Sequence, residues 1–75
     1  MSIFVEIGQN IVSTRKRKGM TQEALALNAD MSVSYLRRIE HGTANPTLDA
    51  LCRIADALGE PFNDIVQVRE YAEVG

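Results

Sequence analysis

The sequence predicts an all-α protein with a single domain. Apolar residues recur at the spacing of an amphipathic helix in several segments, and residues that cap helices separate these segments. Apolar side chains make up 45 % of the 75 residues and aromatic ones only 5 %, and Trp is absent, so we expect an aliphatic core. A chain of this length suffices for one domain. We place its core at about residues 7–66 and treat residues 67–75 as a C-terminal tail.

The first predicted helix runs from about residue 3 to residue 18. Its apolar face carries isoleucines spaced four apart, at positions 3, 7 and 11. A basic run at residues 15–18 falls in the last turn, where cations meet the negative end of the helix dipole. Gly19 then offers the left-handed conformation that often ends a helix. For the basic run, a solvated helix end and a phosphate contact are equally good interpretations.

Two short helices are predicted next, joined by a tight turn. Thr21 is a suitable N-cap for a helix from residue 22 to about residue 28, and Ser32 is one for a helix through about residue 40. Gly42 follows the end of the second helix. The residues expected to face the core are Leu25, Ala26, Ala29, Leu36 and Ile39.

Two further helices complete the predicted fold. Thr47 caps a fourth helix that Gly59 closes, and Pro61 suits the first position of a fifth helix from residue 62 to about residue 66. The apolar face of the fourth helix is expected to contain Leu48, Leu51, Ala55 and Leu58, with Cys52 as a core thiol beside them. Residues 67–75 fit a helix and a strand equally well.

The composition argues against several classes of protein. A single cysteine excludes an internal disulfide framework and a four-cysteine metal site, and His41 has no second histidine at ligand spacing, so we expect no metal. We find no Ser/His/Asp arrangement, no paired carboxylates and no glycine-rich phosphate loop, and we expect neither an enzyme nor a cofactor. The N-terminus lacks the basic start of a signal peptide, and no apolar run approaches the roughly 20 residues that cross a bilayer. These features favour a cytoplasmic protein with no membrane partner.

Charge is distributed unevenly along the chain, whose net charge is −2. Residues 1–42 contain six basic and four acidic side chains, a net of +2. Residues 43–75 contain two basic and six acidic side chains, a net of −4. Because the distribution matters more than the sum, the first half is compatible with a nucleic-acid surface.

The second and third predicted helices have the organisation of a helix-turn-helix, spanning residues 22–41. Small polar residues begin the second of the two, so that this helix can be presented to a groove. Here the sequence resembles the helix-turn-helix family of lambdoid phage repressors and bacterial xenobiotic-response-element-type regulators. The resemblance covers about residues 7–66, through GMTQEALA at 19–26, MSVSYLRRIEHG at 31–42, NPTL at 45–48 and ADALG at 55–59. It implies a compact five-helix, lambda-repressor-like domain, similar to restriction–modification controller proteins, whose third helix lies in the major groove of double-stranded DNA.

The resemblance also implies which side chains face DNA. The positions from which this family reads base edges hold Val33, Ser34, Arg37 and Arg38. An arginine fork can bond guanine O6 and N7 together, which discriminates between bases by about 1–3 kcal/mol. The candidates for phosphate contacts are Gln22, Tyr35, Thr43 and Asn45. Gln22 matches the family's phosphate-contacting glutamine at a helix N-terminus, whereas Tyr35 fits a packing role equally well.

Two further features concern the support of the reading helix. Arg15 and Glu40 match the family's partly buried ion pair, which would fix the angle of that helix. Asp30 occupies the turn position that glycine commonly fills in the family. An aspartate tolerates left-handed backbone geometry, although its carboxylate is unfavourable close to DNA.

A C-terminal apolar group has few expected partners within the chain, and we predict that it forms the seam of a homodimer. Its members are Phe62, Ile65, Val66, Val68 and Tyr71. The alternative is that this group only caps the helical core. Two-fold symmetry would place two reading helices about 34 Å apart and require a near-palindromic site.

The leading interpretation is therefore a dimeric transcriptional regulator that represses by occupying its operator. An activating role, in which the acidic second half of the chain touches RNA polymerase, is one alternative. An antitoxin-like or adaptor module, whose main ligand is another protein, is the alternative from a different class.

Overall fold

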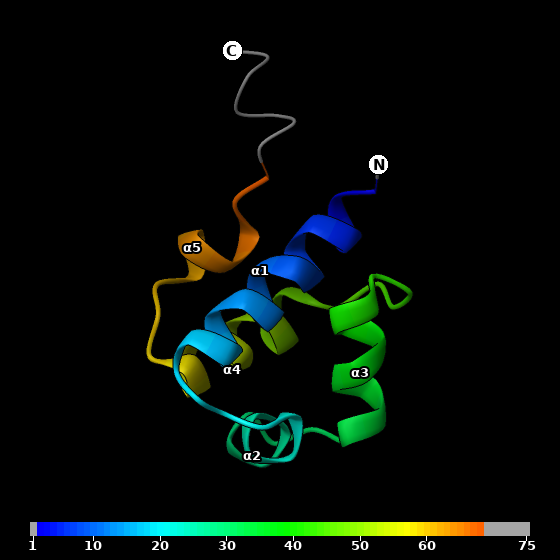
Figure 1. The fold of residues 1–75 in the computed structure, drawn as a ribbon. Helices are drawn as coiled ribbons and strands as arrows, with labels where there is room; N and C mark the ends of the chain where they lie inside the picture. The colour runs from blue at the N-terminus through cyan, green and yellow to red at the C-terminus, as the bar shows by residue number, and fades with distance from the viewer. Residues whose placement is uncertain (1, 69–75) are drawn as a thin grey trace.

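The computed structural model describes residues 2–68, which form five α-helices (Figure 1). The helices are α1 (Ile3–Arg17), α2 (Gln22–Asn28), α3 (Val33–His41), α4 (Leu48–Leu58) and α5 (Phe62–Val66). This part of the chain contains no strand, so the all-α, five-helix prediction is confirmed. Residues 67 and 68 lie outside any helix, and the rest of the predicted tail lies outside the described residues.

Short-range signals in the sequence set the helix boundaries. The hydroxyl oxygens of Thr21, Ser32 and Thr47 each accept a hydrogen bond from a backbone N–H in the first turn of the helix that follows. Gly42 and Gly59 end α3 and α4 in the left-handed conformation, with φ of 78° and 69°. A hydroxyl cap of this kind stabilises a helix by about 1 kcal/mol relative to alanine. These caps set the boundaries of α2, α3 and α4, and the predicted bounds of all five helices agree with the structure to within about a residue.

The core is aliphatic and draws on all five helices. Its largest wholly buried side chains are Ile11, Leu25, Leu36, Ile39, Ile54 and Ile65. Burying such a side chain contributes about 1.5–3 kcal/mol relative to leaving it in water. Helix α1 contacts α3, α4 and α5, whereas α2 packs on α3 and α4, as the ribbon shows (Figure 1). The pair α2–α3 therefore packs against α1 and α4.

Two predictions for α4 are wrong. Leu48 was expected to face the core but is 71 % exposed, at the first position of α4. Cys52 was expected to be a core thiol but is exposed. It lies about 100° around the helix from Leu51, which turns its thiol away from the core. Ile54 fills the centre of the buried face instead.

Helices α1 and α3 approach each other closely where α1 crosses the end of α3. Gly8 is buried there, and a Cβ atom added to it would lie 2.6 Å from the carbonyl oxygen of Ile39 and would also collide with that of Glu40. Only glycine lets the two backbones come this close. The sequence pattern does not reveal the importance of Gly8, which determines how closely α3 packs against α1.

The chain after α5 is fastened to α1. The side-chain amide of Asn10 donates to the carbonyl oxygens of Ile65 and Gln67, at 3.0 and 2.7 Å.

Within residues 2–68, none of the helices has the length and apolar character needed to span a bilayer.

Candidate nucleic-acid interface

Helix α3 has one buried face and one face in solvent. Leu36 and Ile39 are buried at 0 and 1 % exposure, and they anchor the helix to the core. Ser34, Arg37 and Arg38 are exposed on the remaining surface. Figure 1 shows α3 at the margin of the molecule, with its outer side uncovered by any other described helix. The polar side chains of α3 are therefore available to a ligand outside the fold.

The remaining candidates on α3 are less accessible. Val33 and Tyr35 are each partly buried and pack against the hydrophobic core. Each therefore keeps only part of its side chain for contact with another molecule. For Tyr35, the packing interpretation describes the observed position, and the remaining exposed part is compatible with a phosphate contact.

A buried ion pair ties α3 to α1. Arg15 Nε donates to Glu40 Oε2 at 2.8 Å, and its Nη2 donates to Glu40 Oε1 at 3.1 Å. The two side chains are 11 and 3 % exposed. Arg15 Nη1 also donates to the carbonyl oxygen of Met20 at 3.1 Å, which connects the loop before α2. This is the pairing that the sequence predicts, and its two parallel bonds restrict rotation of α3 about its own axis.

Gln22 is bound within the protein on both sides of its amide. Its Nε2 donates to Glu40 Oε1 at 2.8 Å, and its Oε1 accepts a hydrogen bond from Arg37 Nε at 3.2 Å. The family resemblance implies a phosphate contact for Gln22, and neither of these two hydrogen bonds was predicted. They depend on the separation between the start of α2 and the middle of α3, which the sequence pattern does not specify.

The two arginines of α3 differ in their surroundings. Arg37 Nη2 lies 3.6 Å from Glu23 Oε2, and the two side chains are 54 and 67 % exposed. At this exposure the pair contributes at most about 1 kcal/mol, so it is easily exchanged for another anion. Within residues 2–68, the side chain of Arg38 forms no ion pair.

The loop after α3 holds two of the predicted phosphate contacts. Thr43 is exposed, but its hydroxyl donates to the carbonyl oxygen of Arg38 at 3.2 Å, where it helps to cap the helix. That hydroxyl would have to rotate before it could donate to a phosphate. Asn45 is exposed two residues further on.

The turn between α2 and α3 is held by α4. Asp30 adopts φ of 55°, the left-handed conformation expected for it. Arg53 Nη1 donates to the carbonyl oxygens of Asp30 at 2.8 Å and Ala29 at 3.3 Å, so a side chain of α4 closes the end of α2. The sequence analysis did not identify this role for Arg53.

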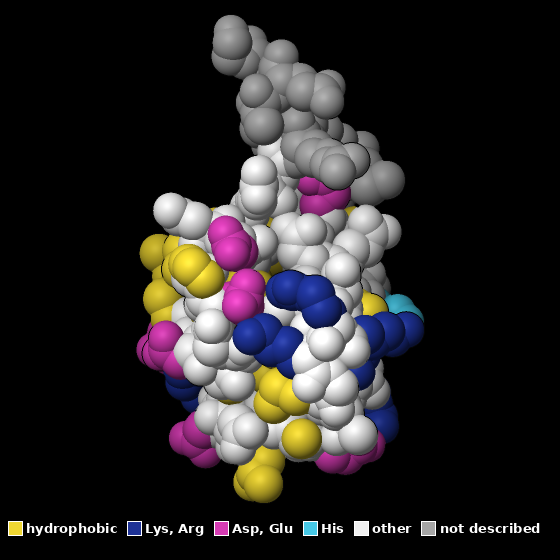
Figure 2. Space-filling view, turned by 60° about the vertical axis from the view of Figure 1, so that its left-hand side comes forward, with side chains coloured by type: hydrophobic (Ala, Val, Ile, Leu, Met, Phe, Trp, Pro, Cys, Tyr) yellow, Lys and Arg dark blue, Asp and Glu magenta, His cyan; other side chains and the backbone are white. Residues whose placement is uncertain are grey.

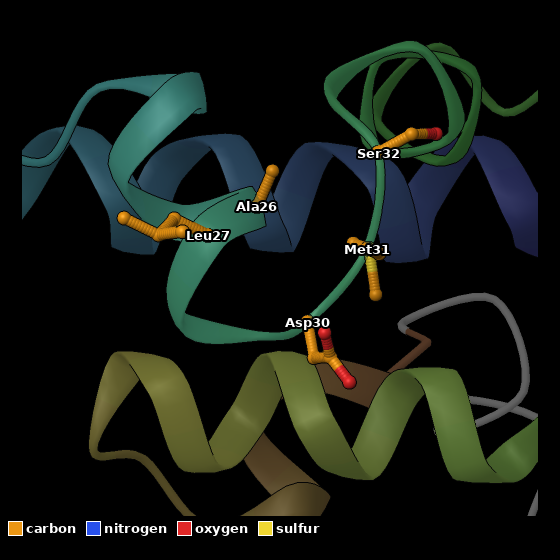
Figure 3. A pocket seen from close by; sticks show the side chains of 5 residues that line it. All are labelled: Ala26, Leu27, Asp30, Met31 and Ser32. Atoms are coloured by element: carbon orange, nitrogen blue, oxygen red, sulfur yellow. The ribbon is translucent and has the colours of Figure 1, made fainter.

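A hollow of about 300 Å³ lies against the same turn, lined by Ala26, Leu27, Asp30, Met31 and Ser32 (Figure 3). Figure 3 shows the Asp30 side chain directed towards α4, with Leu27 on α2 and Ser32 at the start of α3. Leu27 is 80 % exposed. Met31 packs partly against the core.

The predicted dimer residues fall into three groups. Phe62, Val66 and Val68 are partly buried and retain exposed apolar surface. Ile65 is 0 % exposed, so it belongs to the monomer's own core and cannot meet a partner in this conformation. Tyr71 lies outside the described residues.

Basic side chains at the end of α1 are paired with an acid. Lys18 Nζ lies 3.1 Å from Glu60 Oε2, and Arg17 Nη2 lies 3.5 Å from Glu60 Oε1. Figure 2 shows Lys and Arg side chains gathered with acidic ones beside them, so this face is mixed in charge. The end of α1 is therefore not an uninterrupted basic surface.

Comparison with known proteins places these features in a family. The family described as helix-turn-helix matches residues 11–65. The control protein C.BamHI of Bacillus amyloliquefaciens is 38 % identical over 66 residues, which are 87 % of this chain and 82 % of that protein. The immunity repressor protein of Bacillus phage phi105 is 43 % identical over 60 residues, 80 % of this chain and 42 % of the repressor.

A solved structure shows the same fold. The restriction-modification controller protein C.AhdI from Aeromonas hydrophila superposes with a TM-score of 0.81 at 31 % identity, covering 83 % of this chain and 94 % of the controller. The matched segment includes α2, α3 and the turn between them. The five-helix arrangement is the lambda-repressor-like one, and the chain belongs to the helix-turn-helix family.

Proposed function

We propose that this chain is a sequence-specific, cytoplasmic regulator of transcription that binds double-stranded DNA through α3. The observation that carries the proposal is the exposed polar face of α3, which a buried ion pair between Arg15 and Glu40 holds in place. A helix held in this way fits the major groove of DNA. The similarity to a phage immunity repressor and to a control protein of a restriction system supports the same role.

Specific contacts are assigned to the exposed side chains of α3. Arg38 and Arg37 each carry the planar fork that recognises guanine in the major groove, and Ser34 can bond either a base or a phosphate. Val33 offers apolar surface for the methyl group of thymine. Asn45, in the loop that follows, is the best placed of the phosphate candidates, because it is exposed and its loop continues directly from α3.

We further propose that the protein acts as a homodimer and represses by occupying a near-palindromic operator. The apolar surface left by Phe62, Val66 and Val68 is the proposed seam. Two identical subunits related by a two-fold axis read two half-sites in opposite directions, which is why the operator must be nearly palindromic.

The binding proposal is tested with the Arg38→Ala variant. Selection of bound sequences from a random DNA pool first identifies the operator. On this operator, the variant is expected to bind about 5- to 150-fold more weakly, as the loss of one base-reading arginine implies, and to accept substitution of the base pair that Arg38 reads.

Arg17→Ala serves as the matched control for Arg38→Ala. Arg17 is exposed on α1 and lies 3.5 Å from Glu60, so its removal takes away a positive charge without touching α3. The control should leave the base preference unchanged. If selection recovers no preferred sequence with the unmodified chain, or if Arg38→Ala binds as tightly as that chain, the assignment of α3 as the reading helix is wrong.

A further inference from the structure

We infer that Gln22 is a positioning residue for Arg37 and thereby sets base preference, rather than acting only as a phosphate ligand. The inference rests on the proposed function, in which Arg37 reads a base. It is drawn from a continuous chain of hydrogen bonds that runs from α1 through α3 and α2 and back to α3. The members of this chain, which we call the polar relay, are Arg15, Glu40, Gln22 and Arg37.

The chemistry of the relay fixes the orientation of the Gln22 amide. An ionised carboxylate can only accept hydrogen bonds, so the group that faces Glu40 Oε1 at 2.8 Å must be the NH₂ of Gln22. The amide oxygen then faces Arg37. A guanidinium can only donate, so Arg37 Nε–H, 3.2 Å away, meets the one atom of Gln22 that accepts. Reversing the amide would break both contacts.

Glu40 is itself buried and held by hydrogen bonds, which makes it a firm support for the relay. Its carboxylate is held by two hydrogen bonds from Arg15, at 2.8 and 3.1 Å, and its side chain is 3 % exposed. Gln22 is therefore fastened to a buried, fixed group at one end and reaches a solvent-facing arginine at the other. A rigid neighbour of this kind reduces the number of conformations that a base-reading side chain must give up on binding.

The position of the contact on Arg37 is suited to recognition. Gln22 engages Nε, which leaves both terminal nitrogens of the guanidinium, the pair that fits guanine O6 and N7. One of these nitrogens lies 3.6 Å from Glu23, in an exposed pair that a DNA base can replace. The bond to Gln22 can persist while the fork turns towards the base. Of the Gln22 amide, only one N–H is left for a phosphate.

A double-mutant cycle tests the inference on the selected operator. The variants are Gln22→Ala, Arg37→Ala and the two combined. Gln22→Ala alone is expected to weaken binding by about 3- to 10-fold, in the range typical of directly coupled residues. In the Arg37→Ala background the same change should weaken binding clearly less, because the side chain that Gln22 positions is gone and only a contact of the remaining amide N–H with a phosphate can still be lost. Gln22→Met, which keeps the length of the side chain, should behave as Gln22→Ala does.

Arg38 provides the matched control, since it neighbours Arg37 on α3 and no hydrogen bond joins its side chain to Gln22 within the described residues. Combining Gln22→Ala with Arg38→Ala should multiply the two losses. If Gln22→Ala weakens binding by the same factor in the presence and absence of Arg37, and equally for all DNA sequences, Gln22 is a phosphate ligand and the inference is overturned. Thermal unfolding of each variant verifies that the domain remains folded at the temperature of the binding assay.

The cycle also separates failure of the inference from failure of the proposed function. If Arg37→Ala leaves the base preference unchanged, Arg37 is not a reading residue. The positioning role of Gln22 is then rejected as well. If Arg37→Ala alters the preference at one base pair but the two variants act independently, the reading role stands and only the positioning role is rejected.

Discussion

At the scale of single residues, the ion pair of Arg15 with Glu40 differs from the other ion pairs of residues 2–68 in being buried. Arg15 and Glu40 are nearly inaccessible, and they satisfy each other through two hydrogen bonds. The pair of Arg17 with Glu60 also joins segments that are distant in the sequence, but it lies largely in water, with Arg17 at 59 % exposure. Burial therefore distinguishes an ion pair that holds α3 from one that contributes little to stability.

Removal of one partner should reveal this difference. Arg15→Ala leaves the Glu40 carboxylate buried without its main partner, so we expect the free energy of unfolding to fall by about 3–5 kcal/mol. Arg17→Ala, the matched control, should change it by at most about 1 kcal/mol. Urea unfolding followed by circular dichroism measures both values. Equal losses in the two variants would contradict the supporting role of the buried pair.

At the scale of helices, the packing of α3 against α1 requires a residue without a side chain at position 8. Gly8 is the point where the two backbones meet, and any larger residue encounters backbone oxygens that cannot rotate away. Alanine in place of glycine within a helix is otherwise favourable by about 1 kcal/mol, so the sign of the effect reports the contact between the helices.

Gly8→Ala is therefore expected to destabilise the domain by about 1–3 kcal/mol, as overpacking of a tight contact does, and to weaken operator binding because α3 must tilt. Gly19→Ala is the control: Gly19 has φ of 70°, but no atom lies within 4 Å of the added Cβ. That substitution should destabilise through backbone strain alone and leave affinity unchanged once the protein is folded. Thermal unfolding and operator titration give the two readouts. Normal affinity in Gly8→Ala would show that the crossing does not govern how α3 meets DNA.

The helices could be predicted from sequence because their signals are local. Hydroxyl caps at Thr21, Ser32 and Thr47 and the regular spacing of aliphatic residues act within a turn or two of the chain. Burial is different, since it depends on which helix covers which surface. Leu48 therefore has the right spacing yet lies in water, and Cys52 faces away from the core.

The candidate site divides in the same way. The exposed arginines of α3 follow from helical periodicity together with the family resemblance, and their contacts with bases stay predictions. The relay through Gln22 could not be predicted, because its atoms come from three helices and meet only when α1, α2 and α3 are packed. The same holds for Arg53, whose role depends on the position of α4 beneath the turn.

At the scale of the whole molecule, the proposed dimer connects stability to recognition. The proposed seam lies at α5 and the residues just after it, whereas the reading surface lies on α3 (Figure 1). Two subunits can thus associate without covering the side chains that face DNA. The acidic character of the second half of the chain also keeps the remaining surface from attracting DNA nonspecifically.

Val66→Asp tests the dimer, because a carboxylate placed in an apolar seam is unfavourable on association. We expect sedimentation equilibrium to show a monomer, and binding to the full operator to weaken far more than binding to an isolated half-site. Asn63→Asp, on the exposed part of α5, introduces the same charge and should leave both measurements unchanged. A chain that sediments as a monomer before any substitution would remove the basis for the seam.

The position of Cys52 has a practical consequence. It is the only cysteine in the chain, its thiol is exposed, and it sits on α4 rather than on either helix of the helix-turn-helix. A maleimide fluorophore can therefore be attached at one defined place with no engineered residue. Fluorescence anisotropy with the dye on the protein then follows association with unlabelled DNA of any sequence, in the unmodified amino-acid background.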